Sequence, residues 1–183
     1  AFDTQVDVSS VPTNAGETLL VGGFDGHTNT INAIDAETGD RKWTFETDAP
    51  VRSQPTVDDG IVFAGCLDYN LYAVDTETGS EKWSFETGGW IESSPTVVED
   101  TVFVGSTDTH IYAVDRDIGT IHWTLETGGA VSTSPTVSDG TVLVWSETDA
   151  LYAVDADTGA QQWAFDPGEA MITSPTVAED TVL

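Results

Sequence analysis

Basic side chains are nearly absent from this 183-residue chain. Lys and Arg number 5 against 32 Asp and Glu, which gives a formal net charge of −27 at pH 7. We do not expect nucleic acid as a partner, because binding phosphate groups requires clustered Lys and Arg. The same deficit argues against binding to an anionic membrane surface.

Cysteine and long apolar runs are also scarce. Cys66 is the single cysteine, so an intramolecular disulfide is excluded, and we expect a small buried side chain on a strand. No apolar run approaches the ~20 residues that a membrane-spanning helix needs. The first residues show no signal-peptide pattern. The sequence therefore predicts no membrane span.

The acidic surplus has two common explanations. A disordered acidic chain is one, but this chain is 39% hydrophobic, contains six Trp and is clearly periodic. Adaptation to concentrated salt is the other, because at about 1 M salt a Debye length of ~3 Å screens repulsion between carboxylates. We interpret the composition as halophilic, with salt cations at an acidic surface.

A repeat of 40 residues runs along the chain. The positions that mark it are Trp43, Trp83, Trp123 and Trp163, and Pro55, Pro95, Pro135 and Pro175. Internal repeats of this length are typical of solenoids and propellers. The periodicity therefore has to be explained by any fold proposed for the chain.

Each repeat divides into four short runs separated by turn residues. In the third repeat the runs are 91–97, 101–106, 110–115 and 121–127. Runs rich in β-branched and aromatic residues, bounded by Asp, Gly, Ser and Thr, predict strands. The middle two runs are apolar on both faces, as in strands buried between two layers. The pattern predicts an all-β fold, a β-propeller of four-stranded antiparallel blades.

Residues 1–183 are expected to form one propeller domain with four full blades and partial blades at both ends. We place the full blades at approximately 8–47, 51–87, 91–127 and 131–166, and a partial blade at 171–183. An open arc would expose an apolar blade face and unpaired strand edges. A fragment of a larger propeller or an assembly of copies is therefore favoured over a lone open monomer, and a closed four-bladed ring is the third alternative.

Turns between the third and fourth strands repeat an Asp and a Gly four residues apart, as in Asp75 and Gly79. The Asp side chain is expected to bond the backbone two residues on, and the Gly to adopt positive φ. These aspartates therefore have a structural role. The spacing of a calcium-binding loop is missing from them, and no metal site is expected.

The same turns lie within a longer motif, A-x-D-x-x-x-G-x-x-x-W. Its four copies are AIDAETGDRKW (33–43), AVDTETGSEKW (73–83), AVDRDIGTIHW (113–123) and AVDADTGAQQW (153–163). This resembles the tryptophan-docking motif of pyrroloquinoline quinone (PQQ) repeat propellers, over nearly the whole chain. The resemblance implies an eight-bladed propeller in which each motif Trp stacks at a blade joint, between neighbouring blades and against the peptide near the motif Gly.

The resembled family includes quinoprotein dehydrogenases and non-catalytic scaffolds. Its dehydrogenases carry an adjacent-cysteine disulfide, Ca²⁺ ligands and a catalytic Asp, and no residue here matches those positions. We therefore assign no catalytic, cofactor or metal residue. The leading hypothesis is a scaffold or binding module, extracytoplasmic or at the cell surface, with a protein partner or self-association through blade edges. The alternative is part of a PQQ-dependent dehydrogenase whose PQQ and Ca²⁺ are held by regions absent here.

One face of the predicted propeller differs between repeats. We call it the irregular face: it consists of the connections between successive blades and those between second and third strands, such as 88–90 and 107–109. The opposite, uniform face carries the acidic turns. Candidate binding residues on the irregular face are Trp90, Arg52, Glu92, Trp145, Tyr69 and His110. Two alternatives are that Trp145 simply fills space where a strand is wider and that Trp90 packs under a loop.

Overall fold

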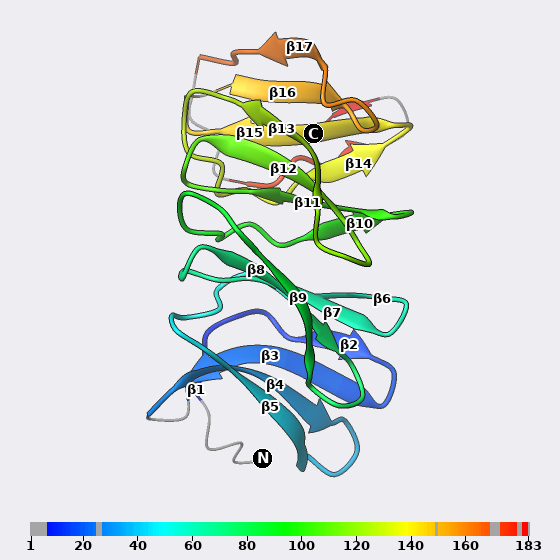
Figure 1. Cartoon of the computed structure of the whole chain (residues 1–183). Coiled ribbons are helices and arrows are strands. Elements are labelled where there is room, and N and C mark those ends of the chain that lie inside the picture. Colours follow the sequence, from blue (N-terminus) through cyan, green and yellow to red (C-terminus); the bar gives the residue numbers. More distant parts are fainter. Residues whose placement is uncertain (1–6, 25–26, 149, 169–172, 179–180, 183) are drawn as a thin grey trace.

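The structure is a computed structural model that describes residues 7–24, 27–148, 150–168, 173–178 and 181–182. All regular structure in these residues is β-strand. Successive sheets stack one upon another along the chain, from the blue N-terminal blade to the orange fourth blade (Figure 1). None of the described residues forms a helix long and apolar enough to cross a membrane.

Four antiparallel sheets form the blades, and each runs in chain order from its inner to its outer strand. The first blade contains β1 (Asp7–Val8), β2 (Thr13–Ala15), β3 (Thr18–Phe24), β4 (Asn29–Asp35) and β5 (Arg41–Thr47). The second contains β6 (Thr56–Asp58), β7 (Ile61–Gly65), β8 (Asn70–Asp75) and β9 (Glu81–Glu86). The third contains β10 (Thr96–Val98), β11 (Thr101–Gly105), β12 (His110–Asp115) and β13 (Ile121–Glu126).

The fourth blade contains β14 (Thr136–Ser138), β15 (Thr141–Ser146), β16 (Ala150–Asp155) and β17 (Gln161–Phe165). A further pair, β18 (Val177–Ala178) and β19 (Thr181–Val182), belongs to the predicted partial blade. Positions 171–172, 179–180 and 183 of that blade lie outside the described residues, as do the first six residues of the chain. The predicted all-β architecture of four-stranded antiparallel blades is confirmed, with the inner strand of the first blade divided into β1 and β2, which both pair with β3.

Apolar side chains of the two middle strands form the core between neighbouring blades. Every residue of β7 and of β11 is buried, and Phe63 and Phe103 are among the largest fully buried side chains. Each core cluster joins two blades: one contains Leu20 of β3 together with Val62 of β7. Burial on both strand faces explains why these runs lack the polar alternation of a half-exposed strand.

The inner strands are shorter than predicted. In the third blade we expected a strand over 91–97, but β10 begins at Thr96. The preceding residues bond elsewhere: the amide of Ile91 donates to the Cys66 carbonyl of the second blade at 3.1 Å. The Ser93 hydroxyl accepts from the amide of Gly105 and donates to its carbonyl, both at 2.8 Å. Side-chain bonding thus replaces ladder pairing in this segment.

Hydrogen bonds also join one blade to the next at the outer and inner strands. The indole Nε1 of Trp43 donates to Thr76 O at 2.8 Å, and that of Trp83 donates to Arg116 O at 2.9 Å. On the inner side, the Thr56 hydroxyl donates to Pro95 O at 2.6 Å. Equivalent bonds recur along the chain. The bonds at the outer and inner strands therefore fix the spacing between neighbouring blades. This spacing positions the loops that connect the strands.

Cys66 is fully buried, as predicted, although it follows the end of β7 rather than lying on the strand. Its Sγ lies 3.1 Å from the carbonyl oxygen of Ala49. Burial raises the pKa of the thiol to about 12. The side chain is therefore a neutral thiol at physiological pH.

Candidate functional site

Two kinds of loop meet on the irregular face. The amide of Gly88, in the connection from the second blade to the third, donates to the Asp108 carboxylate at 2.6 Å. The amide of Thr107 donates to the Trp90 carbonyl at 2.9 Å. These bonds place the connections 88–90 and 107–109 together, as predicted from strand alternation.

Trp90 has a fixed backbone and an exposed side chain. Its amide donates to the Thr107 hydroxyl at 2.8 Å, which complements the bond that its carbonyl accepts. Pro50 and Ala130, at the same repeat position, accept the same carbonyl bond from the following loop. The bond to the backbone carbonyl is thus common to these repeats. The side chain differs: only the third repeat has a tryptophan here, and it is 50% exposed. The indole does not pack under a loop.

Tyr69 supplies a second exposed aromatic ring. Its side chain is 42% exposed, and its backbone has φ +77°, a left-handed conformation that bulky residues rarely adopt. Two bonds from Thr87 hold this backbone: the amide and the hydroxyl each donate to Tyr69 O at 2.9 Å. The ring is therefore presented from a constrained turn.

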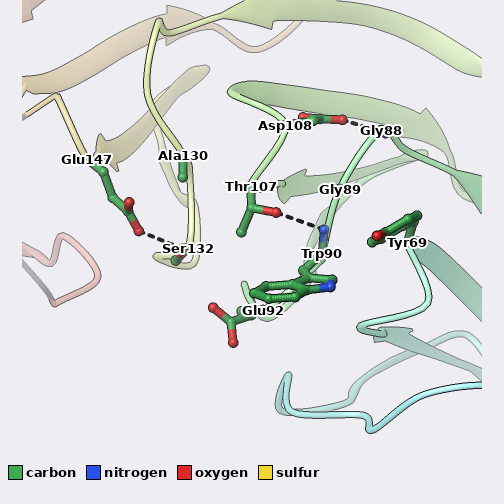
Figure 2. A pocket seen from close by; sticks show the side chains of 10 residues that line it. All are labelled: Tyr69, Gly88, Gly89, Trp90, Glu92, Thr107, Asp108, Ala130, Ser132 and Glu147. Atoms are coloured by element: carbon green, nitrogen blue, oxygen red, sulfur yellow. Dashed lines mark hydrogen bonds between the residues drawn. The ribbon is translucent and has the colours of Figure 1, made fainter.

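These residues border a hollow of about 470 Å³ on the irregular face. We call it the Trp90 hollow, and its lining includes the side chains of Tyr69, Trp90, Glu92, Asp108, Ser132 and Glu147. Figure 2 shows the Trp90 indole projecting with Tyr69 on one side and Glu92 on the other. The lining comes from loops of the second, third and fourth blades.

The three carboxylates of the hollow have different partners. Asp108, whose side chain is 12% exposed, accepts bonds from the Tyr112 hydroxyl at 2.8 Å and from the amide of Gly88. Burial and this bond to Asp108 raise the pKa of Tyr112. Glu92 Oε1 lies 3.2 Å from Arg52 Nη1. Glu147 accepts from the Ser132 hydroxyl at 3.2 Å.

The structure brings some of the predicted site residues together and separates others. Trp90, Tyr69 and Glu92 line the hollow, and Arg52 adjoins it through its ion pair with Glu92. His110 is not part of the lining: its Nδ1 is 2.9 Å from Asp108 O, and its ring contacts Tyr112.

Trp145 lies in β15 and is 7% exposed. It packs with Leu143 and Leu151 of its own blade and with Val177 of the following strand pair. Its side chain therefore fills space in the core, one of the two alternatives that the sequence allowed.

The acidic lining residues Asp108 and Glu147 were not among the candidates of the sequence analysis. Asp108 has a counterpart in the second blade, Asp68, which accepts a hydrogen bond from Tyr72 as Asp108 does from Tyr112. Because this aspartate is shared by the two repeats, comparison of the repeats did not single out Asp108. Glu147 occupies the repeat position of Leu67 and Thr107, and this departure is the signal that could have identified it.

The structure also brings His122, Asp115 and Thr101 together on the outer strands. His122 Nε2 lies 3.4 Å from Asp115 Oδ2, and its Nδ1 lies 3.2 Å from Thr101 Oγ1. In the first blade, Lys42 reaches Asp35 at 3.4 Å and also contacts a threonine hydroxyl. The His–Asp–Thr group is therefore a variant of a repeated structural contact rather than a nucleophilic site.

A family model described as outer membrane protein assembly factor BamB matches residues 3–91, 27–133 and 126–183. Comparison with curated proteins finds no match. Among solved structures, BamB from Moraxella catarrhalis superposes with a TM-score of 0.82 at 21% identity, over 96% of this chain and 54% of that chain.

Two other kinds of protein share the fold. The computationally designed Ika8 protein gives a TM-score of 0.82 at 16% identity, covering 93% of this chain and 53% of that one. Quinohemoprotein alcohol dehydrogenase from Comamonas testosteroni gives 0.76 at 19% identity, covering 90% and 36%. The chain thus spans about half the length of the first two structures, and identities this low show the fold alone. Since the family model matches along almost its entire length, the chain belongs to the PQQ-repeat β-propeller family that includes the assembly factor BamB.

Proposed function

We propose that this chain is a non-catalytic β-propeller module that binds a protein partner through its irregular face. The observation that carries the proposal is the half-exposed indole of Trp90 on a backbone fixed by two hydrogen bonds, at the edge of a 470 Å³ hollow. Trp and Tyr dominate the binding energy of protein interfaces, because they bury a large area with few rotatable bonds.

The family supports a binding role. Its model and a structurally similar protein are both named for BamB, which the model describes as an outer membrane protein assembly factor. An assembly factor acts through contacts with other proteins. By extension we propose an extracytoplasmic or cell-surface location, a salt-adapted acidic surface that attracts cations, and blade edges that support self-association.

A dehydrogenase segment is the second candidate, and the likeness to quinohemoprotein alcohol dehydrogenase favours it. The Trp90 hollow does not fit its cofactor. PQQ is a tricarboxylate, and the hollow presents Glu92, Asp108 and Glu147 with Arg52 as the adjoining cation. Like charges in one site repel. Within the described part of the chain, no group of three or more His, Cys, Asp or Glu side chains is arranged to hold a metal ion.

Site-specific photocrosslinking in the cells that produce the protein tests the proposed function. A photoreactive phenylalanine analogue at Trp90 should give a discrete crosslinked protein. The same analogue at the exposed Glu77 of the uniform face should give none. Equal crosslinking at both positions, or none at Trp90, would contradict a partner site on the irregular face.

Cofactor binding is tested separately. Titration with PQQ and Ca²⁺, followed by tryptophan fluorescence, should give no saturable change. Saturable quenching of tryptophan fluorescence that disappears in Trp90→Leu would contradict the proposal and favour a dehydrogenase segment.

A further inference from the structure

The chemistry of the Trp90 hollow identifies the kind of group that it can bind, given the proposed partner-binding function. Trp90 and Tyr69 present exposed rings, and Glu92 and Glu147 present carboxylates to the same space, with the nearly buried Asp108 adding a further negative charge to the lining. An aromatic face attracts a cation through its quadrupole, most strongly for Trp. The rings and the carboxylates therefore both favour a positively charged ligand.

The carboxylates are not all neutralised within the protein. Glu92 pairs with Arg52, whose own side chain is 59% exposed. Glu147 contacts a serine hydroxyl, and none of the ion pairs among the described residues involves it. Asp108 is already engaged within the protein: it accepts bonds from Tyr112 and from the amides of Gly88 and His110, and its Oδ1 lies 3.5 Å from His110 Nδ1. An exposed pair such as Arg52–Glu92 contributes little stability, so Glu92 can share its charge with an incoming group.

Other classes of ligand fit less well. An anionic group would meet the carboxylates of Glu92 and Glu147 and the negative potential of a chain with net charge −27. A purely apolar group would cover the rings but would also desolvate Glu147 and Glu92 without pairing them, which is costly. A cation on an apolar stem satisfies both halves of the hollow, because its methylene groups cover ring surface while its head reaches a carboxylate.

The lining comes from three successive blades, Tyr69 from the second, Trp90 from the connection to the third, and Glu147 from the fourth. A ligand that contacts all three must cross the loops of neighbouring blades. An extended peptide can do so with side chains directed into the hollow. We propose that the Trp90 hollow binds an arginine or lysine side chain of an extended basic segment in a protein partner.

Backbone order supports this assignment. The Trp90 backbone is fixed by Thr107 on both its amide and its carbonyl, and that of Tyr69 is held by Thr87. Binding therefore orders little more than side chains, which reduces the entropic cost of association. The rigid rings provide a preformed site for the cation.

Peptide titration followed by NMR tests the proposal. The full chain, ¹⁵N-labelled, contains six indole N–H groups, and the Trp90 signal is assigned by its loss in Trp90→Leu. The probe is the peptide acetyl-Gly-Arg-Gly-Arg-Gly-amide, and its control replaces both Arg with citrulline, a neutral isostere. Titrations are run at the lowest KCl concentration at which circular dichroism shows a folded chain.

The arginine peptide should shift the Trp90 indole signal saturably, and the citrulline peptide should bind at least about tenfold more weakly. Affinity measured by calorimetry should fall about fivefold to thirtyfold in Trp90→Leu, and severalfold in Glu147→Gln. Trp163→Leu and Glu77→Gln, which alter exposed residues elsewhere, should stay within about twofold of the parent.

Three results would overturn the proposal, and each is distinct from failure of the partner-binding function. Equal binding of the citrulline peptide would make the hollow an apolar docking site, with photocrosslinking at Trp90 unaffected. Equal losses in Trp163→Leu or Glu77→Gln would show diffuse attraction to an acidic surface. No shift of the Trp90 signal with either peptide would show that the hollow does not bind basic segments, whatever crosslinks there.

Discussion

The indole of Trp83 occupies the space that a side chain on Gly119 would need. A Cβ atom on Gly119 would lie 2.7 Å from Trp83 Cδ2, closer than real Cβ contacts allow. The φ of Gly119 is +71°, a conformation in which glycine is also favoured for steric reasons within its own backbone. Gly79 faces Trp43 and Gly159 faces Trp123 in the same way. The glycine is thus required both by its turn and by the neighbouring blade.

These two requirements can be separated by substitution. Gly140 has the same φ of +71°, but no atom lies within 4 Å of the position of its Cβ. Gly140→Ala should therefore cost only the backbone strain, about 1–2 kcal/mol, whereas Gly119→Ala should cost about 1–3 kcal/mol more through overpacking against the indole. Urea unfolding of both variants measures the difference. Equal losses would show that Trp83 moves aside freely.

The repeat tryptophans differ in burial although their motifs match. Trp83 is 8% exposed, whereas Trp163, on the outer strand of the fourth blade, is 42% exposed. Trp83→Ala should cost about 3–5 kcal/mol of unfolding free energy, as for other buried aromatic residues. Trp163→Ala should cost less than about half of that, because much of the Trp163 side chain remains exposed to water in the folded chain.

The hydrogen bond of the Trp83 indole can be measured apart from its packing. Trp83→Phe keeps an aromatic ring but removes the bond from Nε1 to Arg116 O. The Phe variant should lose at least about 1 kcal/mol, the net value of such a bond. If Trp83→Ala and Trp163→Ala lost equal stability in urea unfolding, burial against the next blade would not be what stabilises this joint.

The fold was predictable because its signals are local and repeated. Strand runs, turn aspartates and the spacing of Trp83 from Trp123 are all visible within one or two repeats, and the strand pattern matched the structure closely. The beginning of β10 was not predictable, since Ile91 bonds to Cys66 of the preceding blade. That contact joins residues in different repeats and leaves no mark in the strand pattern.

The candidate site was predictable only in part. Trp90 and Glu92 departed from the other repeats, and both line the hollow. Trp145 departed as well, but its side chain points into the space between blades: at the equivalent Gly105, a Cβ would meet Val131 of the next blade. Departure from a repeat marks a difference without giving the direction of the side chain, and only packing supplies that direction.

The aspartates at the turns between third and fourth strands predict an acid-sensitive fold. Asp75 Oδ1 accepts from the amide and the hydroxyl of Thr78, both at 2.9 Å, and from the amide of Glu77 at 3.1 Å. The Thr78 amide is the main cause that lowers the pKa of Asp75, and the ion pair with Lys82 adds to it. The pKa values of the other three turn aspartates, Asp35, Asp115 and Asp155, are also lowered.

A lowered folded-state pKa means that the stabilisation is complete above the unfolded-state value of about 3.9 and is lost as pH falls through the folded-state value. The unfolding free energy should therefore decrease as pH is lowered below about 4. In concentrated KCl, where general repulsion is screened, Asp75→Asn should show a smaller decrease, because the amide keeps an oxygen acceptor but does not titrate. Urea unfolding of the parent and of Asp75→Asn at several pH values measures this difference. Parallel curves for the parent and Asp75→Asn would contradict this role, and Glu77→Gln is the control.

Salt should stabilise the chain in proportion to its surface charge. With a net charge of −27, raising KCl from about 0.1 M to about 2 M shortens the Debye length severalfold and should raise Tm. Salt also strengthens apolar burial, so a rise in Tm alone does not identify the cause.

A charge-reduced variant distinguishes the two causes. Glu37→Gln, Glu77→Gln and Asp157→Asn together remove three exposed carboxylates from the uniform face, changing the net charge from −27 to −24. If screening dominates, this variant should have a higher Tm than the parent at low salt, and the two should converge at high salt. If stronger apolar burial dominates, both proteins should gain equally, because their cores are identical. Parallel Tm curves would therefore assign the salt effect to the blade cores and remove the basis for regarding the acidic surface as an adaptation to salt.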